Sequence, residues 1–443
     1  MMPTDAKKVE KMLKDWKGDS YAFGAGALDT LGGFARSYGT RALLVMADLG
    51  LDWVEELYGK VTRSLQASGV SYDVIPGAAP NAPREDVYRI ANEVSKARPD
   101  CIVAVGGGST IDACKCASVL STYAAADVSK HLAAPAAVVS TVEPFFGTGL
   151  VSQLKAATST SPLPVVAVQT IASSGAHLTK YSNITDPMSG QKKLIVDEAV
   201  VPPAAVFDYS VTVGAPKGLT LDGGLDGIAH MWEVFMGASG KDYYAQAEDI
   251  ASEGIRLIVQ NLPTAVRNPQ DLEARVALGY GTDLGGYAIM IGGTNGPHLG
   301  SFSLVDVLSH GRACAVLNPY YTVLFAPAIQ DQLRSMGAVF KDAGVITQDL
   351  EELQGGELGE AVARGMLGFL TQIGYPTSLG EAGVSRGHID RMIEAAKNPQ
   401  LESKLKNMPT PMDPTRGDVD RYMAPVLEAA YSGDLSQVRS MSA

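Results

Sequence analysis

Two short segments in the second half of the chain carry side chains that bind metal ions. Asp226 and His230 are four residues apart, so on a helix they lie one turn apart on one face. His298 and His310 come from a separate segment about seventy residues later, and they would complete a set of three imidazoles and one carboxylate. The chain has only six histidines, and glycines surround both segments, as expected where the backbone closes around a site. Each histidine alone is typical of a packed or surface residue, but the set predicts a divalent metal site.

A glycine-rich turn in the first half of the chain has the features of a phosphate-binding loop. The apolar run 101–105 predicts a buried strand, and it leads into the glycines 106–108, a Ser-Thr pair and a helix. Glycines let the backbone approach an anion closely, and a helix N-terminus offers free N–H groups and a partial positive charge. The turn follows neither the GxGxxG nor the Walker pattern, so it is weak evidence by itself. It indicates a cradle for a pyrophosphate.

Asp48 follows another apolar run that ends at residue 46. An acid at the end of such a strand commonly binds the ribose 2′-hydroxyl of an adenine nucleotide and repels a 2′-phosphate. A helix cap or a solvated loop residue explains Asp48 equally well when it is taken alone. Together with the glycine-rich turn, Asp48 favours NAD over NADP.

The elements that must position these residues change in type near residue 215. The first half contains short apolar runs that predict strands at 42–46, 72–75, 101–105, 164–168 and 205–207. Helical patterns at 52–68 and 84–97 alternate with them, which predicts an α/β nucleotide-binding domain with a parallel sheet and crossover helices. After Pro216 the helical patterns prevail, as at 243–261, 272–292 and 358–373. We therefore predict an α/β domain over residues 1–213 and an all-α metal-binding and substrate domain over residues 214–443, joined within the link 210–220.

The composition excludes several classes of protein. The net charge of -12 over 443 residues argues against nucleic acid or an anionic membrane surface as a partner. The uncharged stretch 156–176 is rich in Ser, Thr and Pro, unlike a membrane helix, and the start of the chain lacks the apolar region of a signal peptide. Four irregularly spaced cysteines predict reduced, buried thiols. We expect a cytoplasmic globular protein.

The chain resembles the iron-containing (group III) alcohol dehydrogenases, which have a dehydroquinate synthase-like fold, from residue 21 to at least residue 319. Seven motifs stand in the order of that family, and an ordered set of this kind is specific. They are the strand before Asp48, the turn 80–83, the loop 106–109, the segments 170–179 and 193–197, the Asp226/His230 pair, and His310 with Gly311.

The resemblance implies a function and a set of site residues. Members transfer hydride between NAD(H) and an alcohol or aldehyde, with a divalent ion that is usually Fe²⁺ and sometimes Zn²⁺, and they often assemble as homodimers or larger homo-oligomers. By position, the ion would be held by Asp226, His230, His298 and His310. The dinucleotide would be lined by Asp48, Asn81, Gly107, Gly108, Ser109, Asp112, Thr170, Thr179, Lys193 and Leu219.

The chain also departs from the family pattern. The run 173–177, which ends at His177, replaces a Gly-Thr-Gly-Ser-Glu-like run, and Tyr181 replaces an Asn near the cofactor ribose. Phe302 stands where many members carry a further histidine, which removes a group for proton exchange and favours a small, uncharged alcohol or aldehyde. An alternative alignment on residues 299–300 would exclude His298 from the ligands but requires an insertion, so we prefer His298.

Three rival functions stay open. A hydroxyacid–oxoacid transhydrogenase uses the same fold, and it would retain NAD(H) tightly during purification. A non-redox lyase or cyclase of the dehydroquinate synthase type would give no net NADH production and would need basic residues for a phosphorylated substrate, for which Arg312 and Lys180 are candidates. A catalytically inactive metal-binding or scaffold protein is disfavoured by the intact set of four ligands.

Overall fold

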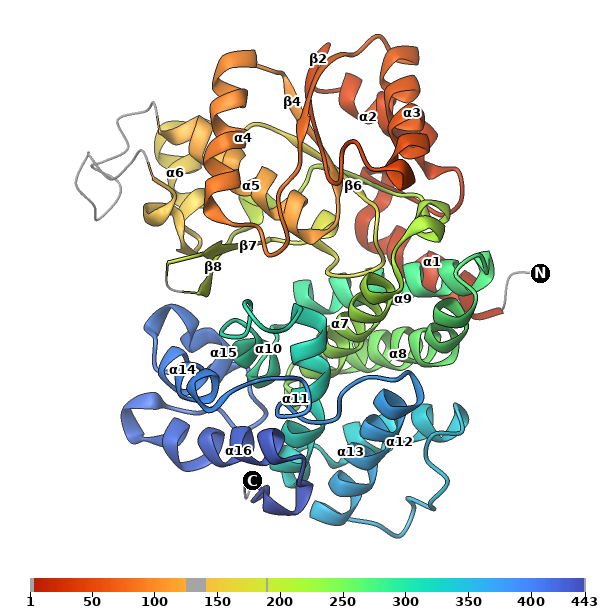
Figure 1. Ribbon diagram of the computed structural model, residues 1–443, viewed down its shortest axis with the longest axis vertical. Helices are drawn as coiled ribbons and strands as arrows, with labels where there is room; N and C mark the ends of the chain where they lie inside the picture. Colours follow the sequence, from red (N-terminus) through yellow and green to blue (C-terminus); the bar gives the residue numbers. More distant parts are fainter. Residues whose placement is uncertain (1–3, 125–140, 189, 442–443) are drawn as a thin grey trace. The chain divides into compact units, whose positions relative to one another are not determined.

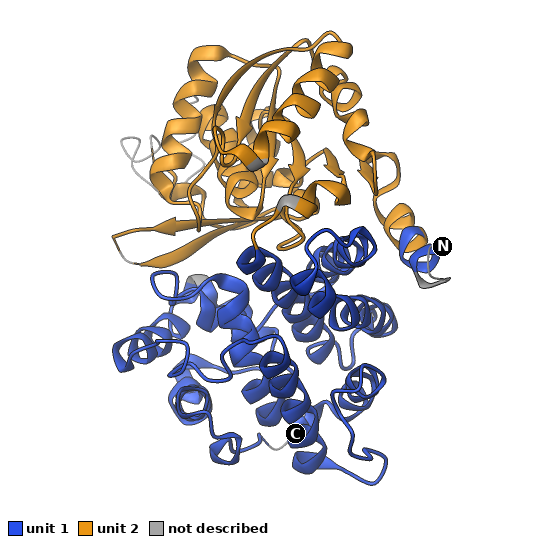
Figure 2. Ribbon diagram, turned by 45° about the vertical axis from the view of Figure 1, so that its right-hand side comes forward, with its two compact units in different colours: residues 1–10, 217–443 blue, residues 11–216 orange. Residues whose placement is uncertain are grey.

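The computed structural model describes residues 4–124, 141–188 and 190–441 (Figure 1). The chain divides into two compact units, an α/β unit of residues 11–216 and a helical unit of residues 217–443 together with residues up to Glu10 (Figure 2). The predicted fold class, an α/β N-terminal part followed by a helical C-terminal part, is confirmed. The structural division falls between Pro216 and Lys217, inside the link 210–220, whereas the predicted domain boundary at 213 and 214 stays a prediction.

A six-stranded parallel sheet forms the centre of the α/β unit, in the order β1-β9-β6-β4-β2-β3. Its strands are β1 (Tyr21–Phe23), β2 (Arg41–Met46), β3 (Ser71–Pro76), β4 (Cys101–Gly106), β6 (Val165–Gln169) and β9 (Ala204–Phe207). All five predicted runs are strands of this sheet, and β1 was not predicted. The strand order reverses between β2 and β4, because β3 lies on one side of β2 and β4 on the other. In open α/β sheets ligands bind beyond the carboxyl ends of the strands at such a point.

A second, three-stranded sheet has the order β5-β8-β7, with β5 (Gly147–Thr148), β7 (Tyr181–Asp186) and β8 (Gln191–Val196). The antiparallel pair β7 and β8 mixes polar and apolar side chains and has only part of its residues buried. No long apolar run marks these strands, so the sequence did not predict them.

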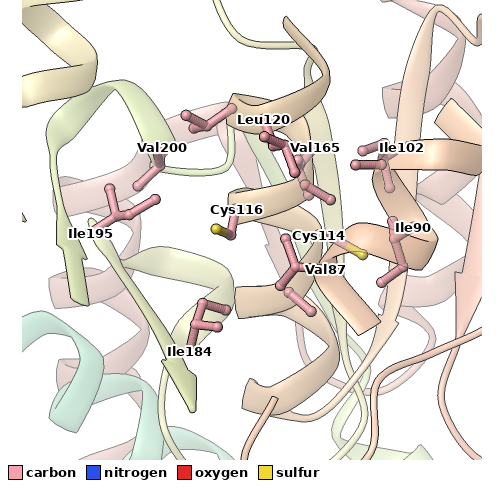
Figure 3. Close-up of a cluster of buried hydrophobic side chains, with 14 of the residues drawn as sticks. Val87, Ile90, Ile102, Cys114, Cys116, Leu120, Val165, Ile184, Ile195 and Val200 are labelled. Carbon is pink, nitrogen blue, oxygen red and sulfur yellow. The ribbon is translucent and has the colours of Figure 1, made fainter. Parts of the chain in front are cut away.

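Helices cover both faces of the large sheet. They are α2 (Leu31–Arg36), α3 (Asp52–Ala67), α4 (Arg84–Ala97), α5 (Gly108–Tyr123) and α6 (Leu150–Thr158), while α1 (Thr4–Lys17) contributes residues to both units. Alternate residues of β2 face opposite cores: Val45 packs with α4 and α5, and Leu44 packs with α2 and α3. Figure 3 shows the core that the sheet forms with α4 and α5, around Cys114 and Cys116 of α5. All four cysteines are free and buried, as predicted.

The helical unit has no strand among its described residues. Its helices are α7 (Lys217–Met236), α8 (Tyr244–Arg267), α9 (Leu272–Ile291), α10 (Gly296–Ser301), α11 (His310–Phe325), α12 (Gln330–Asp342), α13 (Gly355–Gln372), α14 (Arg386–Ala396), α15 (Glu402–Lys406) and α16 (Ala424–Ser432). The three predicted helical patterns correspond to α8, α9 and α13. Helix α7 is buried over most of its length, and a Cβ at Gly227 would lie 3.0 Å from Ile258 of α8 and 3.2 Å from Thr282 of α9. Within the described ranges, no helix is long and apolar enough to cross a membrane.

Candidate metal centre and nucleotide site

Four side chains from three helices of the helical unit converge on one point. Asp226 and His230 lie one turn apart in α7, His298 lies in α10, and His310 is the first residue of α11. The Nε2 atom of each histidine lies 3.7 Å from the Oδ1 atom of Asp226. One donor atom from each residue lies within 4.8 Å of all the others, and only His310 is partly exposed. The structure therefore brings the predicted ligand set together, including His298 of the preferred alignment.

The spacing of these donor atoms suits a metal ion better than direct hydrogen bonds. A distance of 3.7 Å is longer than an N–H···O hydrogen bond. Around a tetrahedral ion with bonds of about 2.1 Å, neighbouring donor atoms are roughly 3.4 Å apart. Three imidazole nitrogens and one carboxylate oxygen are donors that both Zn²⁺ and Fe²⁺ accept. The residues present thus fit a divalent ion.

Hydrogen bonds set the tautomers of two of the histidines. The Nδ1 atom of His298 lies 2.7 Å from Oε1 of Glu233, and a carboxylate there accepts the Nδ1 proton. The Ser301 hydroxyl donates its single hydrogen to the carbonyl oxygen of His298 at 2.7 Å, so it must accept from Nδ1 of His310 at 2.9 Å. Both imidazoles consequently turn an Nε2 lone pair toward Asp226, as metal binding requires.

Close packing of α7 against the start of α11 places His310 beside Asp226. A Cβ at Gly311 would lie 2.0 Å from the backbone oxygen of Asp222 and 3.1 Å from the Asp226 Cβ. Any side chain at residue 311 would therefore push the two helices apart. The glycine that follows His310 in the sequence is explained by this contact.

Sequence reasoning missed two buried charges beside the cluster. Glu233 of α7 has an exposure of 0% and contacts His298, and the buried Lys404 of α15 donates a hydrogen bond to the Thr294 hydroxyl. Burial raises the pKa of Glu233 and lowers the pKa of Lys404, and the attraction between the two charges opposes both shifts. A signal for Glu233 was present, because it is an acid one turn after His230 in an otherwise apolar stretch, and a buried carboxylate needs partners.

Phe302 provides an apolar wall next to the four side chains that could hold a metal ion. Its ring is buried and stacks on His310 at 5.9 Å with an angle of 13° between the planes. The ammonium of Lys404 lies 5.7 Å over the centre of the same ring. Phe302 therefore brings no titratable group to this side of His310.

Six of the predicted nucleotide residues lie at the carboxyl edge of the large sheet, namely Asp48, Asn81, Gly107, Gly108, Ser109 and Thr170. Asp48 follows β2 and is exposed, while the loop 106–109 follows β4. The backbone N–H of Asn81 donates to the Ser109 hydroxyl at 3.0 Å, and the N–H of Thr170 donates to Gly106 at 3.2 Å. The structure thus brings these residues together at the point of strand reversal, which is where open α/β sheets commonly bind ligands.

The backbone at this edge suits close approach of a ligand. A Cβ at Gly107 would have only the Ile171 Cδ1 atom within 4 Å, at 3.5 Å, whereas a Cβ at Gly108 would lie 2.5 Å from the Ser174 hydroxyl oxygen. Asp48 and Asn81 both have left-handed backbones, with φ of 54° and 66°. Such non-glycine conformations are strained and cluster at functional sites. Together with the sixteen-residue helix α5 that begins at Gly108, the loop fits a dinucleotide pyrophosphate.

The other predicted nucleotide contacts are placed differently. Asp112 is buried, and its Oδ2 accepts from the backbone and side-chain nitrogens of Asn183, both at 3.0 Å. The buried Lys115 donates to the carbonyl oxygens of Thr179 and Tyr181, both at 2.8 Å. Asp112 and Lys115 thus hold the segment that carries Thr179.

Two predicted contacts belong to other elements of the chain, and His177 has a packing role. Lys193 of β8 is bound to Glu143 at 2.7 Å. Leu219 belongs to the helical unit, where 39% of it is exposed, and its contact with the dinucleotide stays a prediction. His177 is buried, with Nε2 3.1 Å from the Tyr21 hydroxyl, so it packs inside the α/β unit.

Comparison with known proteins gives consistent matches over nearly the whole chain. The family model described as Iron-containing alcohol dehydrogenase matches residues 19–209, and the one described as Fe-containing alcohol dehydrogenase family, C-terminal matches residues 220–422. The long-chain-alcohol dehydrogenase 1 of Geobacillus thermodenitrificans is 25% identical over 414 residues, which are 93% of this chain and 95% of that protein. The NAD-dependent methanol dehydrogenase of Bacillus methanolicus is 25% identical over 84% of this chain and 90% of its own length. The alcohol dehydrogenase structure from Oenococcus oeni has a similar fold, with a TM-score of 0.77 at 23% identity, over 93% of this chain and 98% of that chain.

Proposed function

We propose that this chain, which belongs to the iron-containing alcohol dehydrogenase family, is a metal-dependent enzyme. In this proposal it transfers hydride between NAD(H) and a small alcohol or aldehyde. The observation that carries this proposal is the convergence of three histidine Nε2 atoms at 3.7 Å from one oxygen of Asp226. We propose Fe²⁺ as the resident ion, with Zn²⁺ as the second candidate. The metal ligands are Asp226, His230, His298 and His310.

The residues of the cluster have separable tasks in this proposal. When bound, the divalent ion supplies Lewis-acid stabilisation of the substrate oxygen, and the nicotinamide accepts or donates the hydride. Asp226 offsets one of the two positive charges of the ion, while the neutral imidazoles leave the other in place. Ser301 holds the His310 ring in the tautomer that exposes Nε2. Phe302 excludes water from one side of His310, and its apolar ring favours a small, uncharged substrate.

The carboxyl edge of the sheet in the α/β unit is the proposed NAD(H) site. Gly107, Gly108 and Ser109 would bind the pyrophosphate at the N-terminus of α5. The exposed carboxylate of Asp48 would accept hydrogen bonds from the adenosine ribose and repel the 2′-phosphate of NADP. The name of the methanol dehydrogenase relative, which states NAD dependence, supports the same choice.

The surroundings of the cluster disfavour a phosphorylated substrate. The Arg312 guanidinium lies over the Tyr375 ring at 4.9 Å and 3.9 Å from the Asp222 carboxylate. Lys180 is bound to Glu198 at 3.2 Å in the α/β unit. The basic residues that a lyase of the dehydroquinate synthase type would need therefore already have acidic or aromatic neighbours.

We also propose a cytoplasmic location, consistent with the four buried thiols, and a homo-oligomer of two or more chains.

The test is metal analysis and turnover of anaerobically purified protein, with His298→Ala and a matched histidine variant. The control is His388→Gln, because His388 bonds Ser385 in the capping box of α14, a role that Gln also fills. We expect about one Fe or Zn per chain and NADH-dependent reduction of small aldehydes in the wild type and the control. Loss of one of four ligands should weaken metal binding more than about 100-fold in His298→Ala.

Other outcomes would select the rivals. Turnover of 2-oxoacids with NAD(H) that stays bound throughout purification would identify the transhydrogenase. Metal binding with no net change in NADH would favour the lyase. Unchanged metal content in His298→Ala would remove His298 from the ligands, and a wild type that binds no metal would refute the proposal.

A further inference from the structure

Glu233 is a buried carboxylic acid beside the four metal-binding side chains, and both of its oxygens have hydrogen-bond partners. Its Oε1 atom lies 2.7 Å from Nδ1 of His298 and accepts from Asn318 at 3.3 Å. Its Oε2 atom accepts from the backbone N–H of Asn295 at 2.8 Å and, more weakly, from that of His298 at 3.4 Å. Both oxygens of the carboxyl group are therefore surrounded by N–H groups, which fix its orientation.

These bonds tie the loop before α10 to the helix that carries two other ligands. Glu233 lies three residues after His230 in α7, and its backbone oxygen accepts from the Asn295 side chain at 2.8 Å. Asn295 in turn caps α10 through a bond from the Gly296 N–H. One residue of α7 thus fixes both the start of α10 and the ring of His298, which α10 presents.

Lys404 supplies the opposite charge. It is buried in α15 and donates to the Thr294 hydroxyl, beside Asn295, whose backbone N–H donates to Glu233. A single buried charge is expensive, whereas a pair of opposite charges with satisfied hydrogen bonds is tolerated. Lys404 is therefore placed to compensate a negative charge on Glu233, which has an exposure of 0%.

We propose that Glu233 is a positioning residue for the metal site, which holds His298 in the tautomer and orientation that direct Nε2 at the ion, and that Lys404 is its buried counter-charge. This inference rests on the proposed function, since it assigns a task to residues around the proposed ion. Carboxylates that accept a hydrogen bond from the N–H of the non-ligating ring nitrogen of a ligand histidine commonly strengthen metal binding. Neither residue touches the ion in this proposal.

The experiment compares Glu233→Gln, Glu233→Leu, Lys404→Met and the double variant Glu233→Gln/Lys404→Met in the full chain. Zn²⁺ affinity is measured by calorimetry, Co²⁺ coordination by its visible absorption spectrum, and stability by Tm in the presence of a chelator. We expect Glu233→Gln to weaken Zn²⁺ binding about 10–100-fold. Glu233→Leu, which offers no acceptor to His298, should weaken it further and change the Co²⁺ spectrum.

The lysine variants separate folding from metal binding. Lys404→Met leaves Glu233 buried without its counter-charge, so its metal-free Tm should fall most. The double variant removes both charges and should recover Tm relative to Lys404→Met, while its Zn²⁺ affinity stays as low as that of Glu233→Gln. If Glu233 had only a structural role, Zn²⁺ affinity would instead rise and fall with Tm across the four variants.

Asp197→Asn is the matched control. Asp197 is a buried carboxylate of the α/β unit that accepts from Ser152 and Ala199, and it is outside both proposed sites. It should lose stability but keep wild-type Zn²⁺ affinity. Equal affinity in the wild type and both Glu233 variants would overturn this inference alone. A wild type that binds neither Zn²⁺ nor Co²⁺ would overturn the proposed function and this inference with it.

Discussion

Replacing Gly311 with alanine tests whether close contact between α7 and α11 builds the metal cluster. The new Cβ would lie 2.0 Å from the backbone oxygen of Asp222, and an ordinary contact begins near 3.4 Å. The obstacle is helix backbone, which cannot rotate away as a side chain does. The start of α11 must therefore move by roughly 1.4 Å, the difference between the two distances.

This displacement has a predictable cost in stability. Overpacking of this kind destabilises by about 1–3 kcal/mol, and the better helix propensity of alanine returns at most about 1 kcal/mol. We expect a net loss of about 1–2 kcal/mol, which corresponds to a fall in Tm of roughly 2–8 °C for a unit of this size.

The metal site should suffer in parallel. Metal–ligand distances are defined within about 0.2 Å, so a shift of about 1 Å at His310 exceeds the tolerance of the site several times over. We expect Zn²⁺ affinity to fall on the order of 10–100-fold, similar to the loss of a supporting residue.

Gly368→Ala is the matched control, measured by calorimetric Tm with a chelator and by Zn²⁺ titration. Gly368 is exposed in α13 of the same unit, and the nearest atom to its added Cβ is Val345 Cγ1 at 3.6 Å. Both substitutions improve helix propensity, but only the one at residue 311 creates an overlap, so Gly368→Ala should gain about 0.5–1 kcal/mol. If Gly311→Ala matched the control in Tm and bound Zn²⁺ like the wild type, the packing argument would be wrong.

Two further predictions concern the α/β unit. In Gly107→Ala, the added methyl group contacts only Ile171, at 3.5 Å, so Tm should be unchanged. If the loop binds the pyrophosphate, the methyl group should reduce NADH affinity about tenfold or more in a fluorescence titration. Unchanged NADH affinity would mean that the phosphates bind elsewhere. Burial lowers the pKa of Lys115 from 10.5 to about 8. Between these pH values the native state therefore binds fewer protons than the unfolded state. The contribution of Lys115 to the free energy of unfolding should consequently rise as the pH rises from about 8 to 10.5. Denaturant titrations of the wild type and Lys115→Met from pH 7 to 10 should show the difference shifting in favour of the wild type, and a difference independent of pH would contradict a buried, perturbed lysine.

The alternation of element types was predictable because it depends on local patterns. Runs such as 101–105 are apolar at every position, as a strand buried on both faces requires, and the observed β4 covers them. The strands β7 and β8 were missed because their mixed side chains resemble those of a loop. The buried cation Lys115 was missed for a related reason, since only its tertiary partners Thr179 and Tyr181 explain it.

The residue types of the metal site and the pairing of Asp226 with His230 could be predicted from the sequence alone, because four residues make about one turn of helix. The sequence also indicated the glycine-rich turn and the acid at residue 48, both of which follow from strand ends. The position of His298 among the other donors required the folded structure, because its distance to Asp226 depends on the packing of α10 against α7. The same packing showed why residue 311 is glycine and revealed Glu233, since the partners of a buried charge come from segments that are distant in the sequence.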